Sequence, residues 1–303
     1  MGLLRSPTVF ALAKEIKMSN TALIDLKGIS EPVKKLIECI STGVGILYEP
    51  TRIRKTAEAE LYSTILKKVG KDLSELEKRT FNRIMATEIK RQVNIDEIIR
   101  KSIEFTPNEL STSEKPCEDW MLDFFDLCKN SSSEGVQMLW AKLLAGEVDQ
   151  PGSFSRRTLH AIKLLTTEQA ELFTKVCGCI WRISGDYVGI VYALILDSDE
   201  DSLYTDDYLG SHASKAYMLE SLGFANYKYY DLEYGKEYLL EFYGEQYVFE
   251  ADPNNRRLEI FVLTPVGEEL YSICGHSRNE AYYQLTMEYL LKKGIKKINK
   301  NES

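Results

Sequence analysis

Apolar residues recur at helical spacing in three successive segments between residues 117 and 173. A run of serines separates the first two segments, and a Pro-Gly-Ser turn at residues 151–153 separates the last two. Three apolar stripes with short joints predict three helices that bury their stripes against one another. The stripe positions are Trp120, Leu122, Phe124, Phe125 and Leu127; Val136, Leu139, Trp140, Leu143 and Leu144; and Leu159, Ile162, Leu164 and Leu165.

The chain before this region also has helical periodicity. Ser30 followed by Glu31 and Pro32 is typical of a helix start. From residue 51 to 101 the chain is charged and helical, with an apolar stripe that includes Leu76 and Ile84. A long helix with a narrow stripe and many charges is typical of a helix that crosses a bundle or pairs with another subunit.

After residue 173 the pattern changes to alternating apolar and polar positions. Residues 181–196 are rich in β-branched and aromatic side chains, which predicts a strand or a buried pair of strands. Residues 239–263 predict an antiparallel unit of two or three strands with a turn at residues 252–255. Thr264 caps a predicted helix, and a final helix follows from residue 279. This order of elements is that of winged-helix modules.

The predicted fold class is therefore α+β, mainly α, with a helical N-terminal part and a small winged-helix-like α+β domain at the C-terminus. We expect a loosely held segment over residues 1–28 and long charged helices over 29–105. The central helical region then covers 114–175, and the winged-helix-like domain covers 176–303.

Charge and cysteine usage limit the classes of function. The formal net charge of −8 argues against indiscriminate binding of polyanions. Six widely spaced cysteines, with no secretory signal peptide at the start, favour reduced thiols in the cytoplasm. The most apolar window, residues 39–48, rises about 15 Å as a helix, so it is too short to span a bilayer of about 30 Å. Contact of this window with a membrane surface is left open.

A dense group of residues gives a family resemblance. The segment WAKLLAGEVDQPGSFSRRTL, with support from Arg91, Gln92, Asn94 and the LTPVGEEL segment, resembles the bacterial family called domain of unknown function 2806. The resemblance extends over roughly residues 30–290. The residues of this family box with a structural or binding role are Trp120, Trp140, Glu147, Pro151, Gly152, Ser155, Arg157 and Thr158.

The resemblance implies a cytoplasmic bacterial protein with a helical part and an α+β part. It supplies no reaction and no catalytic residues. It also suggests an association with phage defence through abortive infection.

The start of the third predicted helix is a candidate anion site. Arg156, Arg157 and His160 follow the Pro-Gly-Ser turn, and a helix start offers free N–H groups to a phosphate. The favoured alternative is structural: Ser155 caps the helix, and Arg157 forms an ion pair with Glu147 or Asp149. An enzyme site at Arg157, His160 and Glu147 is a further alternative. Trp120 and Trp140 are expected in the core rather than in a ligand pocket.

Metal and cofactor signatures fail on spacing. Cys177 and Cys179 have no second ligand pair, so we expect no zinc site. Asp197, Asp199 and Asp201 begin like a calcium loop, but Ser202 stands where that loop needs glycine. The sequence also lacks GxSxG, HExxH and GxGxxG motifs. We therefore expect no metal and no cofactor, and a non-enzymatic role is favoured.

Charge also separates the two remaining functions. Between residues 186 and 250 there are 3 Lys+Arg and 14 Asp+Glu, a net charge of −11, which repels nucleic acid. Arg256 and Arg257 are the candidate nucleic-acid contacts nearby. The favoured function is an interaction or sensing module, with a protein partner or a homo-oligomer formed through residues 51–103. The alternative is a winged-helix regulator that binds nucleic acid.

Overall fold

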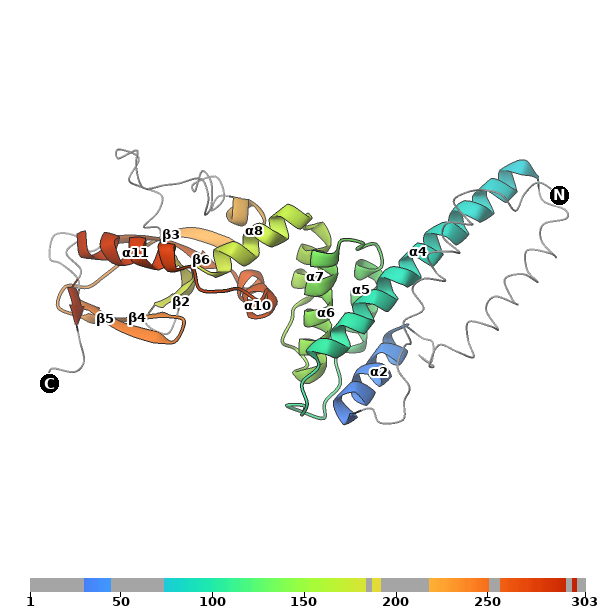
Figure 1. The fold of residues 1–303 in the computed structure, drawn as a ribbon, viewed down its shortest axis with the longest axis horizontal. Coiled ribbons are helices and arrows are strands. Elements are labelled where there is room, and N and C mark those ends of the chain that lie inside the picture. Colours follow the sequence, from blue (N-terminus) through green and yellow to red (C-terminus); the bar gives the residue numbers. More distant parts are fainter. Residues whose placement is uncertain are drawn as a thin grey trace. The chain divides into compact units, whose positions relative to one another are not determined.

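The computed structural model describes residues 30–44, 74–183, 187–191, 218–250, 257–292 and 296–298. The chain divides into two compact units, Met1–Phe154 and Ser155–Ser303. The described elements of the first unit are helices, and the second unit combines helices with an antiparallel sheet (Figure 1). The predicted α+β class with mainly helical structure is confirmed. The finer division into four segments stays a prediction, and segment 1–28 lies outside the described residues.

The first unit contains the helices α2 (Glu31–Val44), α4 (Glu75–Phe105), α5 (Glu118–Cys128) and α6 (Glu134–Asp149). Helix α6 is buried on almost every side because α2 and α4 both pack against it. Trp140 of α6 is fully buried, and its ring meets that of Phe124 edge to face at 5.3 Å. Trp120 stacks on the same phenylalanine at 5.4 Å. Both tryptophans therefore lie in the core of this unit.

Helix α4 has two different halves. Ser74 caps it through a reciprocal pair of bonds with Glu77. Its buried residues begin only at Asn94 and are Asn94, Ile95, Ile98, Ile99, Lys101 and Ser102. Two polar contacts fix this second half: Lys101 donates to the Gln137 side chain at 2.8 Å, and Asn94 donates to the carbonyl of Lys129 at 2.9 Å. The residues before Asn94 have no buried member.

The second unit begins with α7 (Arg156–Leu164) and α8 (Thr167–Cys177). The sequence pattern predicted one helix here, and this prediction is wrong. Thr166 and Gln169 form a capping box, which starts a new helix and ends α7. As a consequence, Leu164 is 75% exposed, although its position in the stripe predicted burial.

The sheet has seven strands in the order β3-β6-β2-β1-β4-β5-β7, and every neighbouring pair is antiparallel. The predicted strands are present, but the likeness to a winged helix is not confirmed. Strands β5 and β6, expected as neighbours, are separated because the β1–β2 hairpin lies between β6 and β4. The strands are β1 (Trp181–Ile183), β2 (Tyr187–Val191), β3 (Ala225–Asp231), β4 (Glu237–Phe242), β5 (Glu245–Glu250), β6 (Arg257–Leu263) and β7 (Lys296–Ile298).

Strand β6 is buried on both faces, because its consecutive residues 260–263 are all buried. Ile260 and Val262 belong to a core cluster that also contains Trp181 and residues of α11 (Glu280–Lys292). Helix α10 (Pro265–Ile273) follows β6 directly, and Thr264 caps it as predicted. Gly267 of α10 lies so close to the chain that an added Cβ would be 2.0 Å from the Phe224 carbonyl oxygen.

This close approach predicts a large effect of one methyl group. We expect Gly267→Ala to lower the free energy of unfolding by about 1–3 kcal/mol, because backbone at a helix start must move to make room. Gly135→Ala is the matched control, since no atom lies within 4 Å of its Cβ position. Urea denaturation of both variants measures the difference. Equal stability of the two variants would contradict the packing described for α10.

Candidate functional site

A buried carboxylate organises the turn after α6. Glu147 is 1% exposed, and its two oxygens accept the backbone N–H groups of Gly152 at 2.7 Å and Phe154 at 3.0 Å. Gly152 has a φ of 87°, a conformation that favours glycine. The indole N–H of Trp120 binds the Phe154 carbonyl at 2.8 Å. Four residues of the family box therefore build this turn.

A second carboxylate holds the chain just after it. Glu269 of α10 accepts the backbone N–H of Ser155 at 2.7 Å and the hydroxyl of Thr158 at 2.6 Å. Ser155 also caps α7, because its hydroxyl accepts the Thr158 N–H. A negative charge thus already sits at the start of α7, where sequence analysis placed a candidate phosphate site. The protein supplies this anion itself.

The structure places the other box residues around these contacts. Pro151 is half-buried in the turn, whereas Arg157 and His160 are exposed on α7. Asp149 accepts both the backbone N–H and the hydroxyl of Ser111, at 2.7 and 2.9 Å. Both oxygens of Glu147 are engaged by backbone N–H groups, which leaves this carboxylate poorly suited to acid–base chemistry. The ion pair of Arg157 with Glu147 or Asp149 stays a prediction.

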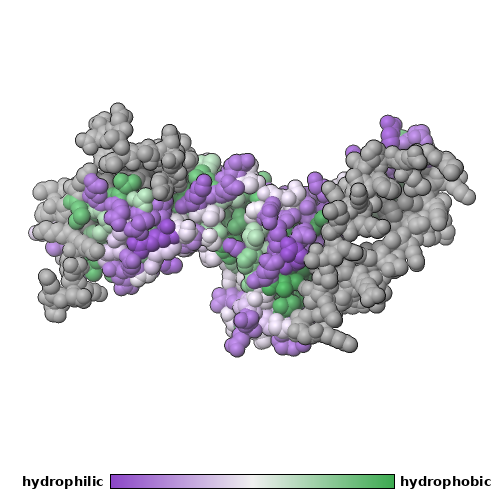
Figure 2. Space-filling model, in the orientation of Figure 1, coloured by the Kyte–Doolittle hydropathy of each residue, from purple (hydrophilic) through white to green (hydrophobic). Residues whose placement is uncertain are grey.

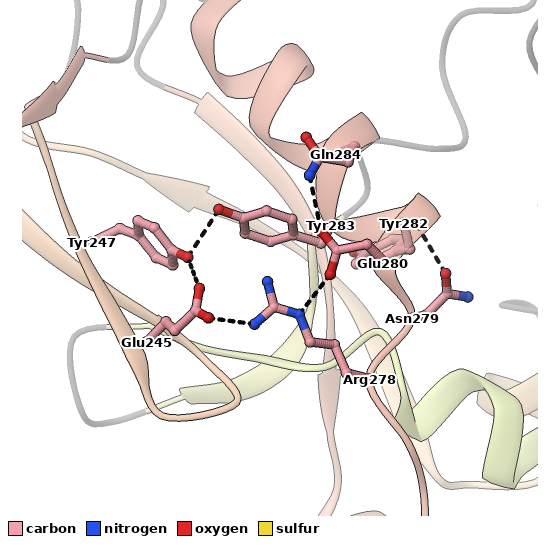
Figure 3. Close-up of polar contacts among 8 residues, drawn as sticks. All are labelled: Glu245, Tyr247, Arg278, Asn279, Glu280, Tyr282, Tyr283 and Gln284. Carbon is pink, nitrogen blue, oxygen red and sulfur yellow. Dashed lines mark hydrogen bonds and ion pairs between the residues drawn. The ribbon is translucent and has the colours of Figure 1, made fainter.

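A chain of hydrogen bonds joins strand β5 to α11, as Figure 3 shows. Tyr283 donates to the Tyr247 hydroxyl at 2.9 Å, and Tyr247 donates to Glu245. Arg278 links Glu245 at 2.7 Å with Glu280 at 2.8 Å. We call these five residues the tyrosine–arginine cluster. Sequence analysis missed the cluster, because its members are spread over residues 245–283 and form no motif.

The electrostatics of the tyrosine–arginine cluster favour a structural role. The guanidinium of Arg278 stacks on the rings of Tyr283 and Phe242, with its carbon 4.6 and 5.3 Å from their centroids. Hydrogen bonds to Glu245 raise the pKa of Arg278. Burial and the bond to Glu245 raise the pKa of Tyr247, so this phenol stays protonated. A charged, stacked arginine between two carboxylates anchors the β4–β5 turn to the start of α11.

A histidine lies on the other side of the same turn. The hairpin turns at Tyr243 and Gly244, with φ of 50° and 81°. The hydroxyl of Tyr243 shares a hydrogen bond with Nδ1 of His276, and the His276 ring stacks on Tyr271 at 4.4 Å. Burial lowers the pKa of His276 and raises that of Tyr243. The neutral imidazole is thus the form that the fold stabilises.

The cysteines near this loop are buried thiols. Cys177 and Cys179 end α8, and Cys274 ends α10. Burial raises the pKa of Cys179 to about 12, and burial and its bond to Cys274 raise that of Cys177. These thiols are protonated at neutral pH, so they lack the thiolate that nucleophilic and metal-binding chemistry needs. In the part of the chain that the structure describes, no three potential ligands converge on a metal position.

Several candidate positions lie outside the described residues: Arg256, Asp197, Asp199 and Asp201, and the second half of the window 39–48. Arg257 begins β6, and nothing is known of its side chain. Across the described ranges, no helix combines the length and apolar character needed to cross a bilayer.

The Glu147 turn predicts a sensitive substitution. We expect Glu147→Gln to lower the free energy of unfolding by about 2 kcal/mol or more, because an amide offers one acceptor to two buried N–H groups. Asp149→Asn is the control: the Ser111 hydroxyl can reverse its bond, so the expected loss is below about 1 kcal/mol. Chemical denaturation measures both. A Glu147→Gln variant as stable as the control would refute the clamp.

His276 predicts a pH effect on stability. The fold lowers the pKa of His276 below its ordinary value of 6.5. Below pH 6.5 the unfolded chain therefore binds more protons than the folded chain, and the free energy of unfolding falls as the pH falls. We expect a steeper loss in the wild type than in His276→Gln between about pH 7 and about pH 5. Parallel denaturation curves for the two proteins across this range would contradict the prediction.

The comparisons with known proteins agree with the geometry in giving no reaction. No curated protein and no solved structure matches the chain. One family model matches, described as protein of unknown function (DUF2806), over residues 78–287. The match begins within α4, includes the Glu147 turn and Glu269, and ends within α11. Because it spans more than half of the 303 residues, the chain belongs to the DUF2806 family.

Proposed function

We propose that the protein is a non-enzymatic interaction module that assembles with a second copy of itself through the first half of α4. This half is the described portion of the region 51–103, which the sequence indicated as a contact surface. A single observation carries the proposal: α4 keeps large apolar side chains in solvent over residues 75–93. Leu76 is 66% exposed, Ile84 is 49% exposed and Val93 is 37% exposed.

The exposed face continues the buried face of the same helix. Ile84 and Ile95 are eleven residues apart, which is about three helical turns, so both point to the same side. Ile95 is buried where α4 packs on α6, whereas Ile84 remains exposed. Leu76 and Ile84 have the eight-residue spacing of one apolar stripe. An apolar face that is covered over half its length favours a partner for the other half.

The surroundings of this face suit a protein partner. Within residues 75–93, Glu75, Glu77 and Glu88 alternate with five Lys and Arg residues, so the helix offers charges of both signs. Much of the described surface is hydrophilic, with smaller hydrophobic areas between (Figure 2). A cytoplasmic location belongs to the proposal, because all six cysteines are free.

Two other functions stay predictions. The nucleic-acid alternative depends on Arg256 and Arg257, whose side chains lie outside what the structure describes. A role in phage defence has no support from the contacts or from the family match.

Light scattering after size exclusion tests the assembly. We expect the wild type to have a mass that is a multiple of 34.7 kDa, and Leu76→Glu/Ile84→Glu to approach 34.7 kDa. Each apolar side chain buried in the interface contributes about 1.5 kcal/mol or more, so losing both weakens association at least about tenfold. Leu122→Glu is the control, because Leu122 is 50% exposed on α5. A wild type that is monomeric at its highest attainable concentration would reject self-assembly.

A further inference from the structure

Helix α7 separates its residues cleanly into two faces. Thr158, Leu159 and Ile162 are buried. Arg157, His160 and Lys163 are exposed, and Leu164 at the end of the helix is 75% exposed. The sequence of α7, RRTLHAIKL, contains no acidic residue. The outer face is therefore basic, with one apolar side chain beside the charges.

The fold makes no use of these charges. Arg157, His160 and Lys163 form no hydrogen bond or ion pair with the described parts of the chain. Arg100 and Arg278, in contrast, each bind two glutamates. The start of α7 is stabilised by Ser155 and Glu269 instead. Removing the three side chains would therefore cost the fold little, and their shared face is free for a ligand.

Leu164 adds an apolar element to this face. It has the largest exposed fraction among the big apolar side chains that the structure describes, whereas its neighbour Leu165 is buried at 8%. A leucine gains little from a phosphate or a small anion, but it gains from contact with an apolar side chain. The combination favours a ligand with both negative charge and apolar groups.

We propose that the outer face of α7 binds a short acidic segment of a partner protein, with an apolar residue of that segment against Leu164. A duplex nucleic acid is less favoured, because it would extend beyond α7 over acidic surface. Glu168 and Glu171 are exposed on the next helix, and residues 186–250 carry a net charge of −11. A short peptide contacts α7 alone and avoids this repulsion. The site is independent of the proposed assembly through α4.

Fluorescence anisotropy on the full chain tests this site with three labelled probes. The first is a short peptide of glutamate and leucine, the second replaces its leucines with serine, and the third is a DNA duplex. We expect the leucine peptide to bind best, and Arg157→Glu/Lys163→Glu to weaken it by at least about tenfold. Leu164→Ser should weaken the leucine peptide by about fivefold and leave the serine peptide unchanged.

The control variant is Lys175→Glu/Lys228→Glu, which makes the same change in net charge at two other exposed lysines. We expect it to change the affinity by less than about twofold, because these positions are screened from α7 by salt. Circular dichroism melts show that all variants fold. The proposal is overturned if neither peptide binds, if the duplex binds more tightly than the peptides, or if the control variant loses as much affinity as the α7 variant.

Discussion

A buried carboxylate needs hydrogen-bond donors, and the centre of this chain is built around that need. Glu147 cannot remain charged at 1% exposure unless groups with N–H bonds surround it, and the turn at residues 152–154 provides two of them. The turn can take this path because Gly152 accepts a positive φ. Gly146 allows the Phe154 ring to lie against the helix, since a Cβ there would be 2.8 Å from it.

The same device recurs one residue later in the second unit. Glu269 binds the N–H of Ser155, so adjacent peptide groups at Phe154 and Ser155 are held by carboxylates from two different parts of the sequence. This explains why the family box is dense. Its glycines, serine and threonine are the residues that permit or complete these contacts, and a reaction is not needed to account for them. Arg157, His160 and Lys163 remain as members of the region without such a task.

Local signals in the sequence predicted most of the elements. The caps at Ser155 and Thr264 were recognised because their bonds join residues only three positions apart. The capping box of Thr166 and Gln169 was also present, but the apolar run through Leu165 concealed it. The strand order was not predictable, because β5 and β6 are close in sequence and separated in the sheet by the β1–β2 hairpin. Nor was the role of Glu269, whose partners lie more than a hundred residues earlier.

The titratable groups near the β4–β5 turn show why binding is a better interpretation than catalysis. An enzyme usually shifts pKa values toward neutrality, so that a group can exchange protons during the reaction. Here the shifts go the other way: the pKa of Tyr247 and of Cys177 is raised, and that of His276 is lowered. Each group is thereby held in its neutral form. Arg278 is held charged, between two glutamates and two aromatic rings. Groups fixed in single protonation states serve to hold two loops together, which leaves exposed faces such as those of α4 and α7 as the places where this protein meets others.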